Sequence, residues 1–357
     1  MTFNPESVQG FDLGVESRAP VSIKDRFIIP PFSVLRTMDG DWVARKRAWL
    51  SLGIESEVGR GGHLLGMSES NYEAMYDKDS QNGVLFKSQD RLNEIVKQGK
   101  NPTAVKAGLT FGEMPNYDGS NRNVICGTSI FDPVLCELAY RWWCPQNGSI
   151  LDPFSGGSVR GIVAAFLERN YTGVDLRPEQ IEANVAQWQK IGSRDYAADK
   201  PTPKWVVGNS TRITRLAPGE YDFVFSCPPY GDLEVYSDNP EDLSTMSHEA
   251  FMEDYRRIIT RSCSLLKNDR FACFVVGDFR DKNGFYRNFV ADTISAFLDA
   301  GLHFYNEAIL VTAIGSLRFR ITKQFNSGRK LGKTHQNILV FYKGDPKKIK
   351  ENFGENF

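Results

Sequence analysis

The residues best placed to do chemistry form a short run directly after the apolar segment 221–225: Ser226, Cys227, Pro228, Pro229 and Tyr230. Neither proline offers a backbone N–H and each restricts the residue before it, so a strand cannot continue through them. The chain must therefore leave the sheet in a rigid corner that presents a Tyr ring beside a hydroxyl and a thiol. The alternative interpretation is an ordinary Pro-Pro loop that ends a strand.

A second group of candidates follows the predicted strand at 148–154. Asp152 and Phe154 lead into Gly156 and Gly157, which separate this strand from a helix. Two glycines at such a place let a ligand approach the backbone closely, and the helix N-terminus adds favourable polarity. The pattern is neither G-x-G-x-x-G nor a P-loop, so it supports a phosphate-binding role only weakly.

Two polar side chains end the next predicted strands. Asp175 comes about twenty residues after the glycines, where a carboxylate can accept hydrogen bonds from two ribose hydroxyls. Asn209 ends the following strand and can offer an amide edge to a base such as adenine. Each residue alone fits ordinary turn chemistry, but their succession at adjacent strand ends indicates a ligand site.

Strands that alternate with helices must position these residues. The sequence predicts strands at 148–154, 171–176, 204–210, 221–226, 270–279, 304–315 and 335–343, and helices at 132–143, 158–170, 177–190, 247–266 and 288–301. This alternation is typical of βαβ units and a parallel sheet. We expect a doubly wound, mostly parallel Rossmann-like sheet over residues 122–345 that ends in an antiparallel strand pair, followed by a tail at 346–357. Such a sheet binds ligands beyond the carboxyl ends of its strands.

The first 121 residues are less regular. A polar arm occupies the first 25 residues, and Gly and Pro interrupt the remainder so often that only helices, such as one at 41–53, can be expected. In that helix Arg45, Lys46 and Arg47 lie between Trp42 and Trp49, which fits either contact with phosphates or a helix with a buried Trp face. We expect this irregular region to read the target of the protein.

Composition sets the class of protein. The 357 residues are 41% hydrophobic with a net charge of −1, so nucleic-acid binding would require local basic patches. The six cysteines form no C-x-x-C pair, and the four histidines form no convincing metal-ligand cluster. No apolar run approaches the ~20 residues of a membrane span, and no leader is visible. We therefore expect a cytoplasmic protein without a metal and without a membrane partner.

Together these motifs resemble the S-adenosylmethionine-dependent DNA amino-methyltransferases, which methylate the exocyclic nitrogen of adenine or cytosine. The segment "LDPFSGG" resembles the cofactor loop of that family, "GVDL" its ribose-binding strand end, and "CPPY" its catalytic motif. The segment 127–143 stands where the family has a further cofactor-contacting element. The cofactor loop precedes the catalytic motif, as in the gamma class, and the whole is similar to phage or prophage DNA methylases.

The resemblance implies a role for the corner. The target base is flipped out of the duplex, the Tyr stacks on it, and the first residue of the motif and the following Pro carbonyl accept hydrogen bonds from the amino group. The prolines then hold the acceptor and the stacking face in one geometry. S-adenosylmethionine would contact Asp152, Phe154, Gly156, Gly157, Asp175 and Asn209.

The first position of the motif departs from the family. Adenine-specific relatives usually have Asp there and cytosine-N4 relatives often have Ser, whereas this chain has Cys227. Because sulfur is a weak acceptor, either Ser226 or the backbone carbonyls take over the contact, or the chemistry differs. A neutral residue slightly favours cytosine N4. An activated thiolate could instead attack carbon 6 of cytosine and direct methylation to carbon 5.

A run of cations indicates the partner. Between the last two predicted strands, residues 315–335 hold six cations and no acidic residue, in what we expect to be a loop over the catalytic edge: Arg318, Arg320, Lys323, Arg329, Lys330 and Lys333. Phosphates of double-stranded DNA would favour such a loop, although many charge runs are merely solvated. Other hypotheses are RNA as the substrate and a decayed methyltransferase that only binds DNA.

Overall fold

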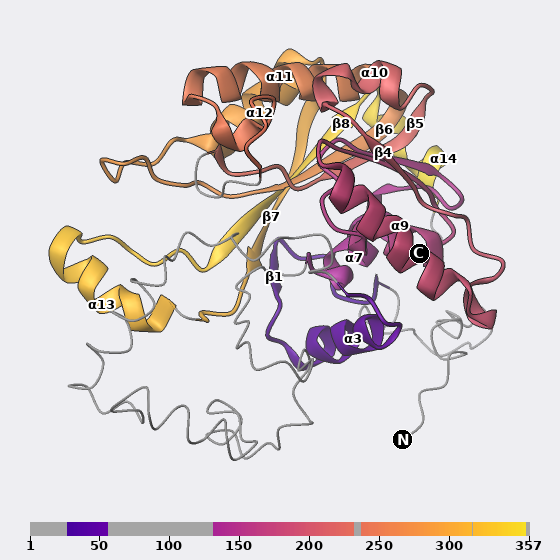
Figure 1. The fold of residues 1–357 in the computed structure, drawn as a ribbon, viewed down its shortest axis with the longest axis horizontal. Helices are drawn as coiled ribbons and strands as arrows, with labels where there is room; N and C mark the ends of the chain where they lie inside the picture. Colours follow the sequence, from indigo (N-terminus) through magenta and orange to yellow (C-terminus); the bar gives the residue numbers. More distant parts are fainter. Residues whose placement is uncertain (1–26, 56–130, 232–236, 316, 355–357) are drawn as a thin grey trace. The chain divides into compact units, whose positions relative to one another are not determined.

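The computed structural model describes residues 27–55, 131–231, 237–315 and 317–354. Within them, one sheet of eight strands has the order β1-β7-β8-β6-β5-β2-β3-β4 (Figure 1). The strands are β1 (Val34–Arg36), β2 (Ser149–Asp152), β3 (Asn170–Asp175), β4 (Lys204–Val207), β5 (Tyr221–Ser226), β6 (Leu266–Val276), β7 (His303–Val311) and β8 (His335–Lys343).

All neighbouring strands are parallel except the pairs that β8 makes with β6 and β7, which are antiparallel. This architecture confirms the predicted fold class, a doubly wound and mostly parallel sheet that ends in an antiparallel strand pair. From β2 the chain proceeds to β3 and β4 on one side, and it then returns to β5 and β6 on the other. The direction therefore reverses between β2 and β5, the point where sheets of this kind bind ligands.

Helices cover both faces of the sheet (Figure 1). One buried apolar cluster packs against α3 (Gly40–Ser51), α7 (Pro133–Trp143), α8 (Val159–Phe166) and α9 (Pro178–Gly192), and the other against α10 (Ile213–Leu216), α11 (His248–Ser264) and α12 (Phe289–Asp299). Strand β5 contributes side chains to both apolar clusters. Phe223 and Phe225 belong to the first cluster and Val224 to the second, because successive side chains point to opposite faces.

Local signals explain where several helices begin. Asp132 caps α7, where its carboxylate accepts a hydrogen bond from the Val134 N–H at 3.0 Å, and Pro133 stands at the first helical position. Ser247 caps α11 in the same way, through the Ala250 N–H. These caps fix the start of helices that the apolar periodicity had already indicated.

The first described residues belong to the same sheet. β1 pairs in parallel with β7 at the outer edge, and Leu35 and Trp42 are almost fully buried. This finding extends the sheet beyond the predicted limit at residue 122. Most of the region that we expected to read the target lies outside the described residues.

The basic helix α3 uses two of its cations within the fold. Arg45 forms a bidentate pair with the buried Glu137 on α7, and Lys46 lies 3.0 Å from the Asp132 carboxylate. Trp49 donates to the same Glu137 at 2.8 Å. The buried-Trp interpretation of this helix is therefore correct, and the charges of Arg45 and Lys46 hold α3 against α7.

The cationic segment between β7 and β8 is not a loop, as we had expected, but contains the helix α13 (Leu317–Gly328). The chain leaves β7 at its carboxyl end, so α13 lies beyond the same edge of the sheet as the Pro-Pro corner. The segment reads as loop in the sequence because Gly315, Gly328 and Gly332 surround a helix with few apolar residues.

Candidate functional site

The glycine loop after β2 is fixed by hydrogen bonds from two other elements. The Gly156 N–H donates to the Asp175 carboxylate at 2.9 Å, and the Gly156 carbonyl accepts from Asn184 on α9 at 2.7 Å. Gly156 has a φ of +47°, a conformation that favours glycine. Gly157 follows with its backbone partly exposed. The loop thus presents backbone at the point where β2, β3 and α8 meet.

Asp175 ends β3 beside this loop. Its second carboxylate oxygen accepts from the Arg177 N–H at 3.0 Å, and the residue stays partly exposed. Burial raises the pKa of the carboxyl above its ordinary value, although the N–H groups of Arg177 and Gly156 act in the opposite direction. A ligand that brings further hydrogen-bond donors would favour the ionised form, which makes Asp175 a receptive site for hydroxyl groups.

Asn209 lies after β4, the next strand of the sheet. Its side-chain oxygen caps the turn Ser210–Arg212 by accepting from the Thr211 N–H at 2.8 Å. The cap occupies the amide oxygen and leaves the amide nitrogen for a ligand. The Gly208 N–H donates to the Asp175 carbonyl at 2.8 Å and the Ser210 hydroxyl to the Pro153 carbonyl at 2.6 Å, so the ends of β2, β3 and β4 are joined.

Asp152 occupies a different environment from the one expected of a cofactor ligand. It is fully buried and accepts hydrogen bonds from Arg160 at 2.5 Å, Tyr171 at 2.7 Å and Ser226 at 2.5 Å. With its oxygens occupied in this way, Asp152 positions the glycine loop rather than offering its carboxylate to a ligand. Phe154 is partly exposed, and its ring packs 6.0 Å from that of Tyr255.

Ser226, the last residue of β5, also faces the interior. Its hydroxyl donates to Asp152 and accepts from the Phe154 N–H at 3.2 Å, and the side chain is fully buried. Ser226 therefore joins the two strand ends and is not available to accept a hydrogen bond from a substrate. The first residue of the corner with an accessible side chain is Cys227, which is partly exposed, and Pro228 behind it is buried.

Tyr230 is held in one orientation by residues that are distant in the sequence. Its hydroxyl accepts a hydrogen bond from Gln336 at the start of β8, at 2.7 Å. Its ring centroid lies 6.3 Å from that of Phe279 and 6.2 Å from that of Phe289. The ring remains partly exposed, so it offers a stacking surface that cannot easily rotate.

Sequence reasoning missed Gln336, Phe279 and the buried partners Arg160 and Tyr171. None of them stands in a recognisable motif. Each contributes through a contact with a residue of another element, which spacing along the chain does not reveal.

The six predicted DNA-contacting cations fall into two groups. Lys333 reaches the corner: its ammonium donates to the Asp278 carbonyl at 3.3 Å, and burial lowers its pKa. A side chain at Gly277 would begin 3.3 Å from this ammonium and 4.0 Å from the Tyr230 hydroxyl. Lys333 and Tyr230 therefore both lie beside Gly277.

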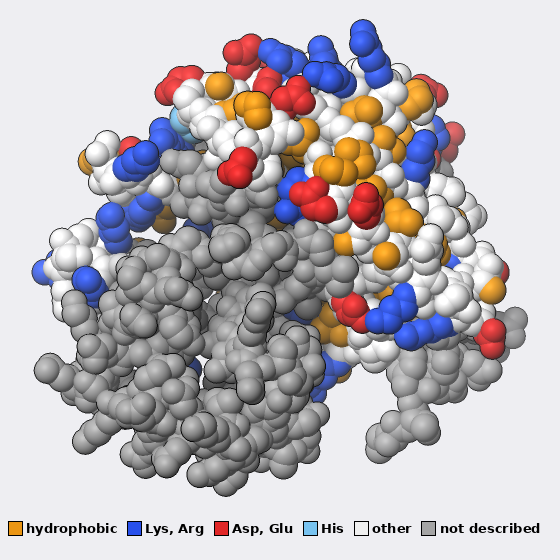
Figure 2. Space-filling model, in the orientation of Figure 1, with side chains coloured by type: hydrophobic (Ala, Val, Ile, Leu, Met, Phe, Trp, Pro, Cys, Tyr) orange, Lys and Arg blue, Asp and Glu red, His pale blue; other side chains and the backbone are white. Residues whose placement is uncertain are grey.

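The other cations lie farther along the same segment. Arg318, Arg320 and Lys323 are exposed on α13. Arg329 stacks over Phe325 at 5.2 Å, and Lys330 lies against Gly284. Figure 2 shows Lys and Arg side chains gathered over α13 and over the loop that precedes α12, at the left of the view.

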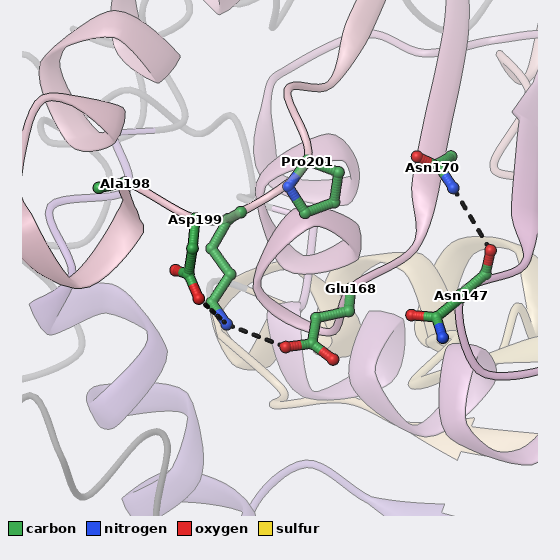
Figure 3. A pocket seen from close by; sticks show the side chains of 7 residues that line it. Asn147, Glu168, Asn170, Ala198, Asp199 and Pro201 are labelled. Atoms are coloured by element: carbon green, nitrogen blue, oxygen red, sulfur yellow. Dashed lines mark hydrogen bonds and ion pairs between the residues drawn. The ribbon is translucent and has the colours of Figure 1, made fainter.

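A polar cavity of about 380 Å³ lies elsewhere, near the amino ends of β2 and β3 (Figure 3). Its Lys200 pairs with Glu168 at 3.1 Å and Asp199 at 3.8 Å, and Asn170 donates to the Asn147 carbonyl at 3.3 Å. The polar groups of the cavity are therefore paired with one another by ion pairs and hydrogen bonds. Since none of the predicted site residues lines it, this cavity is separate from the candidate site.

Two kinds of feature are absent from the described part of the chain. No group of three or more His, Cys, Asp or Glu residues there could hold a metal ion. Every helix there is also too short or too polar to span a bilayer.

No protein-family model matches the sequence. No curated protein matches it either.

The chain is similar in structure to several methyltransferases. It aligns with TrmN from Thermus thermophilus at 13% identity and a TM-score of 0.40, over 60% of this chain and 49% of that one, so it spans about half of TrmN. A methyltransferase from Pyrococcus furiosus aligns at 13% identity and a TM-score of 0.40, over 72% of this chain and 100% of that one. Magnesium protoporphyrin IX methyltransferase from Synechocystis, with bound S-adenosylmethionine, aligns at 13% identity and a TM-score of 0.35, over 56% of this chain and 71% of that one. At such identities the likeness concerns the fold alone.

Proposed function

We propose that this protein is a DNA methyltransferase that transfers the methyl group of S-adenosylmethionine to the exocyclic amino group of a flipped base. One observation carries the proposal. The Gly156 loop and Asp175, joined by a hydrogen bond, lie at the ends of β2 and β3, and the Cys-Pro-Pro-Tyr corner ends β5 on the other side of β2. In this proposal the cofactor and the target base would bind on the two sides of one reversal point of the sheet.

The residues present fit the cofactor. The Asp175 carboxylate is only partly exposed, and this degree of burial disfavours its charged form. Two ribose hydroxyls would donate further hydrogen bonds to it and so stabilise the charge. Gly156 and Gly157 would allow close backbone approach, and the Asn209 amide nitrogen would reach the base. When bound, S-adenosylmethionine supplies an electrophilic methyl group on a sulfonium centre. The protein positions that group by the shape of this rigid edge.

The corner would position the target base. Tyr230 offers a stacking ring whose hydroxyl is held by Gln336. Because Ser226 is occupied by Asp152, the hydrogen-bond acceptors for the amino group would be backbone carbonyls of the Cys227–Pro228 segment. Carbonyl acceptors keep electron density on the amino nitrogen without a charged side chain. This arrangement requires neither an Asp nor a Ser at the position of Cys227.

The cationic surface supports double-stranded DNA as the substrate. Six cations without an acidic residue between them extend from α13 to Lys333, beside Tyr230. Phosphate contacts by exposed Arg and Lys side chains supply affinity that is independent of sequence. We favour cytosine N4 over adenine N6 as the acceptor because the side chain at position 227 is neutral.

A second candidate reaction is methylation at carbon 5 of cytosine, with Cys227 as the nucleophile. The observation that favours it is the exposure of this thiol: among the five free cysteines in the described part of the chain, the other four are buried. The buried Arg160 guanidinium also interacts electrostatically with Cys227. The covalent route requires the thiolate form of this residue.

Nucleoside mass spectrometry on DNA from cells that express the protein tests both candidates. We expect N4-methylcytosine, or N6-methyladenine, in cells with the wild-type chain and with Cys227→Ala, and a strong reduction with Tyr230→Ala. Appearance of 5-methylcytosine that disappears with Cys227→Ala would instead establish the covalent route. Tyr305→Ala serves as the control, because this ring is exposed on β7 away from the corner.

A purified-protein measurement completes the test. Binding of S-adenosylmethionine without methylation of DNA or RNA would contradict the proposal, and loss of both would indicate a decayed relative. Sequencing of the methylated DNA would give the recognition sequence.

A further inference from the structure

A tight hairpin follows β6 at the same edge of the sheet as the corner. We call residues 280–286 the β6 hairpin; a bridge between Arg280 and Tyr286 closes it. The Asp281 N–H donates to the Phe285 carbonyl at 2.8 Å, and the Phe285 N–H donates to the Asp281 carboxylate at 2.9 Å. Gly284 supplies the turn with a φ of +92°. The backbone of Phe285 is therefore fixed on both sides.

The tip of this rigid turn is aromatic and exposed. Phe285 is 72% exposed and Tyr286 is 47% exposed. A single exposed apolar residue needs no explanation, but adjacent exposed rings on a hydrogen-bonded turn are costly to leave in water. Phe285 has no polar atom on its side chain, so its contribution to function must come from stacking or apolar contact.

Cations surround the two rings. The Arg280 guanidinium lies 3.9 Å above the Tyr286 ring and donates to the Gly284 carbonyl at 2.7 Å, and the Lys333 ammonium lies 6.0 Å from the same ring. Lys330 lies against Gly284. The acidic residue of the hairpin, Asp281, uses its carboxylate on backbone N–H groups, which lower its pKa.

The base of the hairpin is joined to the corner. The Arg287 N–H donates to the Phe279 carbonyl at 2.9 Å, and the Phe279 ring lies 6.3 Å from that of Tyr230. The position of Phe285 is thus mechanically coupled to the ring that we assign to the target base. When a base is flipped out, the duplex has a gap in its base stack with phosphates on both sides. An exposed aromatic ring surrounded by cations is complementary to such a gap.

We infer that Phe285 inserts into the base stack of duplex DNA and fills the space that the flipped target base leaves, while Arg280, Lys330 and Lys333 contact the flanking phosphates. This inference rests on the proposed DNA methyltransferase function. Its physical basis is that a vacated position in the stack exposes two base faces to water, and an aromatic side chain restores their stacking.

The test compares two unmethylated synthetic duplexes that carry the recognition sequence, as identified by sequencing methylated DNA from expressing cells. In one the target base is normally paired, and in the other it lies opposite an abasic site, which makes extrusion easy. With radiolabelled S-adenosylmethionine, we expect Phe285→Ala to lower the methylation rate on the paired duplex by about tenfold or more, because unstacking is no longer compensated. On the abasic duplex the rate should stay within about threefold of wild type.

The control is Phe32→Ala, because Phe32 is 68% exposed, close to Phe285 in exposure, but precedes the edge strand β1. It should leave both rates unchanged. Phe285→Trp should retain most of the activity because it keeps a stacking ring. An unchanged rate of Phe285→Ala on the paired duplex, or an equal loss on both duplexes, would overturn the inference. Failure of the wild-type chain to methylate any DNA would instead refute the proposed function.

Discussion

The two sides of the candidate site are built differently. On the side of β2, β3 and β4, hydrogen bonds join the strand ends: Asp152 to Arg160, Tyr171 and Ser226, Gly156 to Asp175, and Gly208 to the Asp175 carbonyl. On the side of β6, α13 and the β6 hairpin, the surface is exposed, cationic and aromatic. In the proposed function, the first side would hold the cofactor in one geometry, and the second would contact DNA over an extended surface.

The proposed function therefore assigns different roles to the two sides. Substitutions on the first side should affect folding and cofactor affinity, and substitutions on the second should affect DNA affinity and turnover. The following predictions test that division.

The largest effect should be on stability and should come from the buried pair of Asp152 and Arg160, which we call the buried hub. Arg160→Met leaves the fully buried Asp152 without its cation, and breaking such a pair costs about 3–5 kcal/mol of the free energy of unfolding. Chemical denaturation measures this loss. The paired variant Arg160→Met with Asp152→Leu should recover part of the stability; if it is no more stable than Arg160→Met alone, the hub does not act as an ion pair.

Tyr230→Ala should reduce DNA methylation by about a hundredfold, because the target base loses its stacking surface and its orientation. S-adenosylmethionine affinity and thermal stability should remain close to wild type, since the partly exposed ring packs only at the edge of the core. Single-turnover rates and calorimetric binding separate the two quantities. An equal loss of cofactor affinity would contradict the division between the two sides.

Asp175→Asn should weaken S-adenosylmethionine binding by about tenfold to a hundredfold, the range for hydrogen bonds to a charged group. The amide keeps the shape of the carboxylate but offers one acceptor where the carboxylate offers two. Isothermal calorimetry gives the affinity, and unchanged binding would remove Asp175 from the cofactor site.

The pH dependence of cofactor binding follows from the same residue. The folded pKa of Asp175 is raised by burial, so the folded protein binds a proton at pH values where the unfolded chain has already released it. The stability contribution of this group is therefore present at low pH and lost as the pH rises through the folded pKa. Cofactor affinity should change in the opposite direction, rising through that pKa to a plateau, and this dependence should be absent in Asp175→Asn.

The smallest effect should come from α13. Replacing Arg318, Arg320 and Lys323 together by Ala should reduce the slope of log affinity against log salt by about 2–3, because each phosphate contact contributes about 0.9. Cofactor affinity should not change. The control pair Lys204→Ala and Arg215→Ala removes exposed cations near β4, at the other edge of the sheet, and should leave the slope unchanged.

Much of the fold was predictable because its signals are local. The continuous apolar run 223–225 places β5, and the prolines at 228 and 229 end it. Glycines and caps separate the helices from the strands. The membership of β1 in the sheet was not predictable, because three residues with one buried side chain carry no pattern. The helix α13 was missed for a related reason: its described side chains are exposed or only partly buried, so no fully buried face among them marks the helical period.

The doubly wound sheet could be predicted from the sequence, together with the order of the glycine loop, the acidic strand end and the Pro-Pro corner along it. Which polar side chains at these strand ends are buried among one another became visible only in the folded chain. Asp152 and Ser226 belong to the same strand ends as Gly156 and Cys227, yet their side chains bond to each other inside the protein. The physical reason is that a buried polar group needs a partner, and that partner can come from any element that the fold brings near.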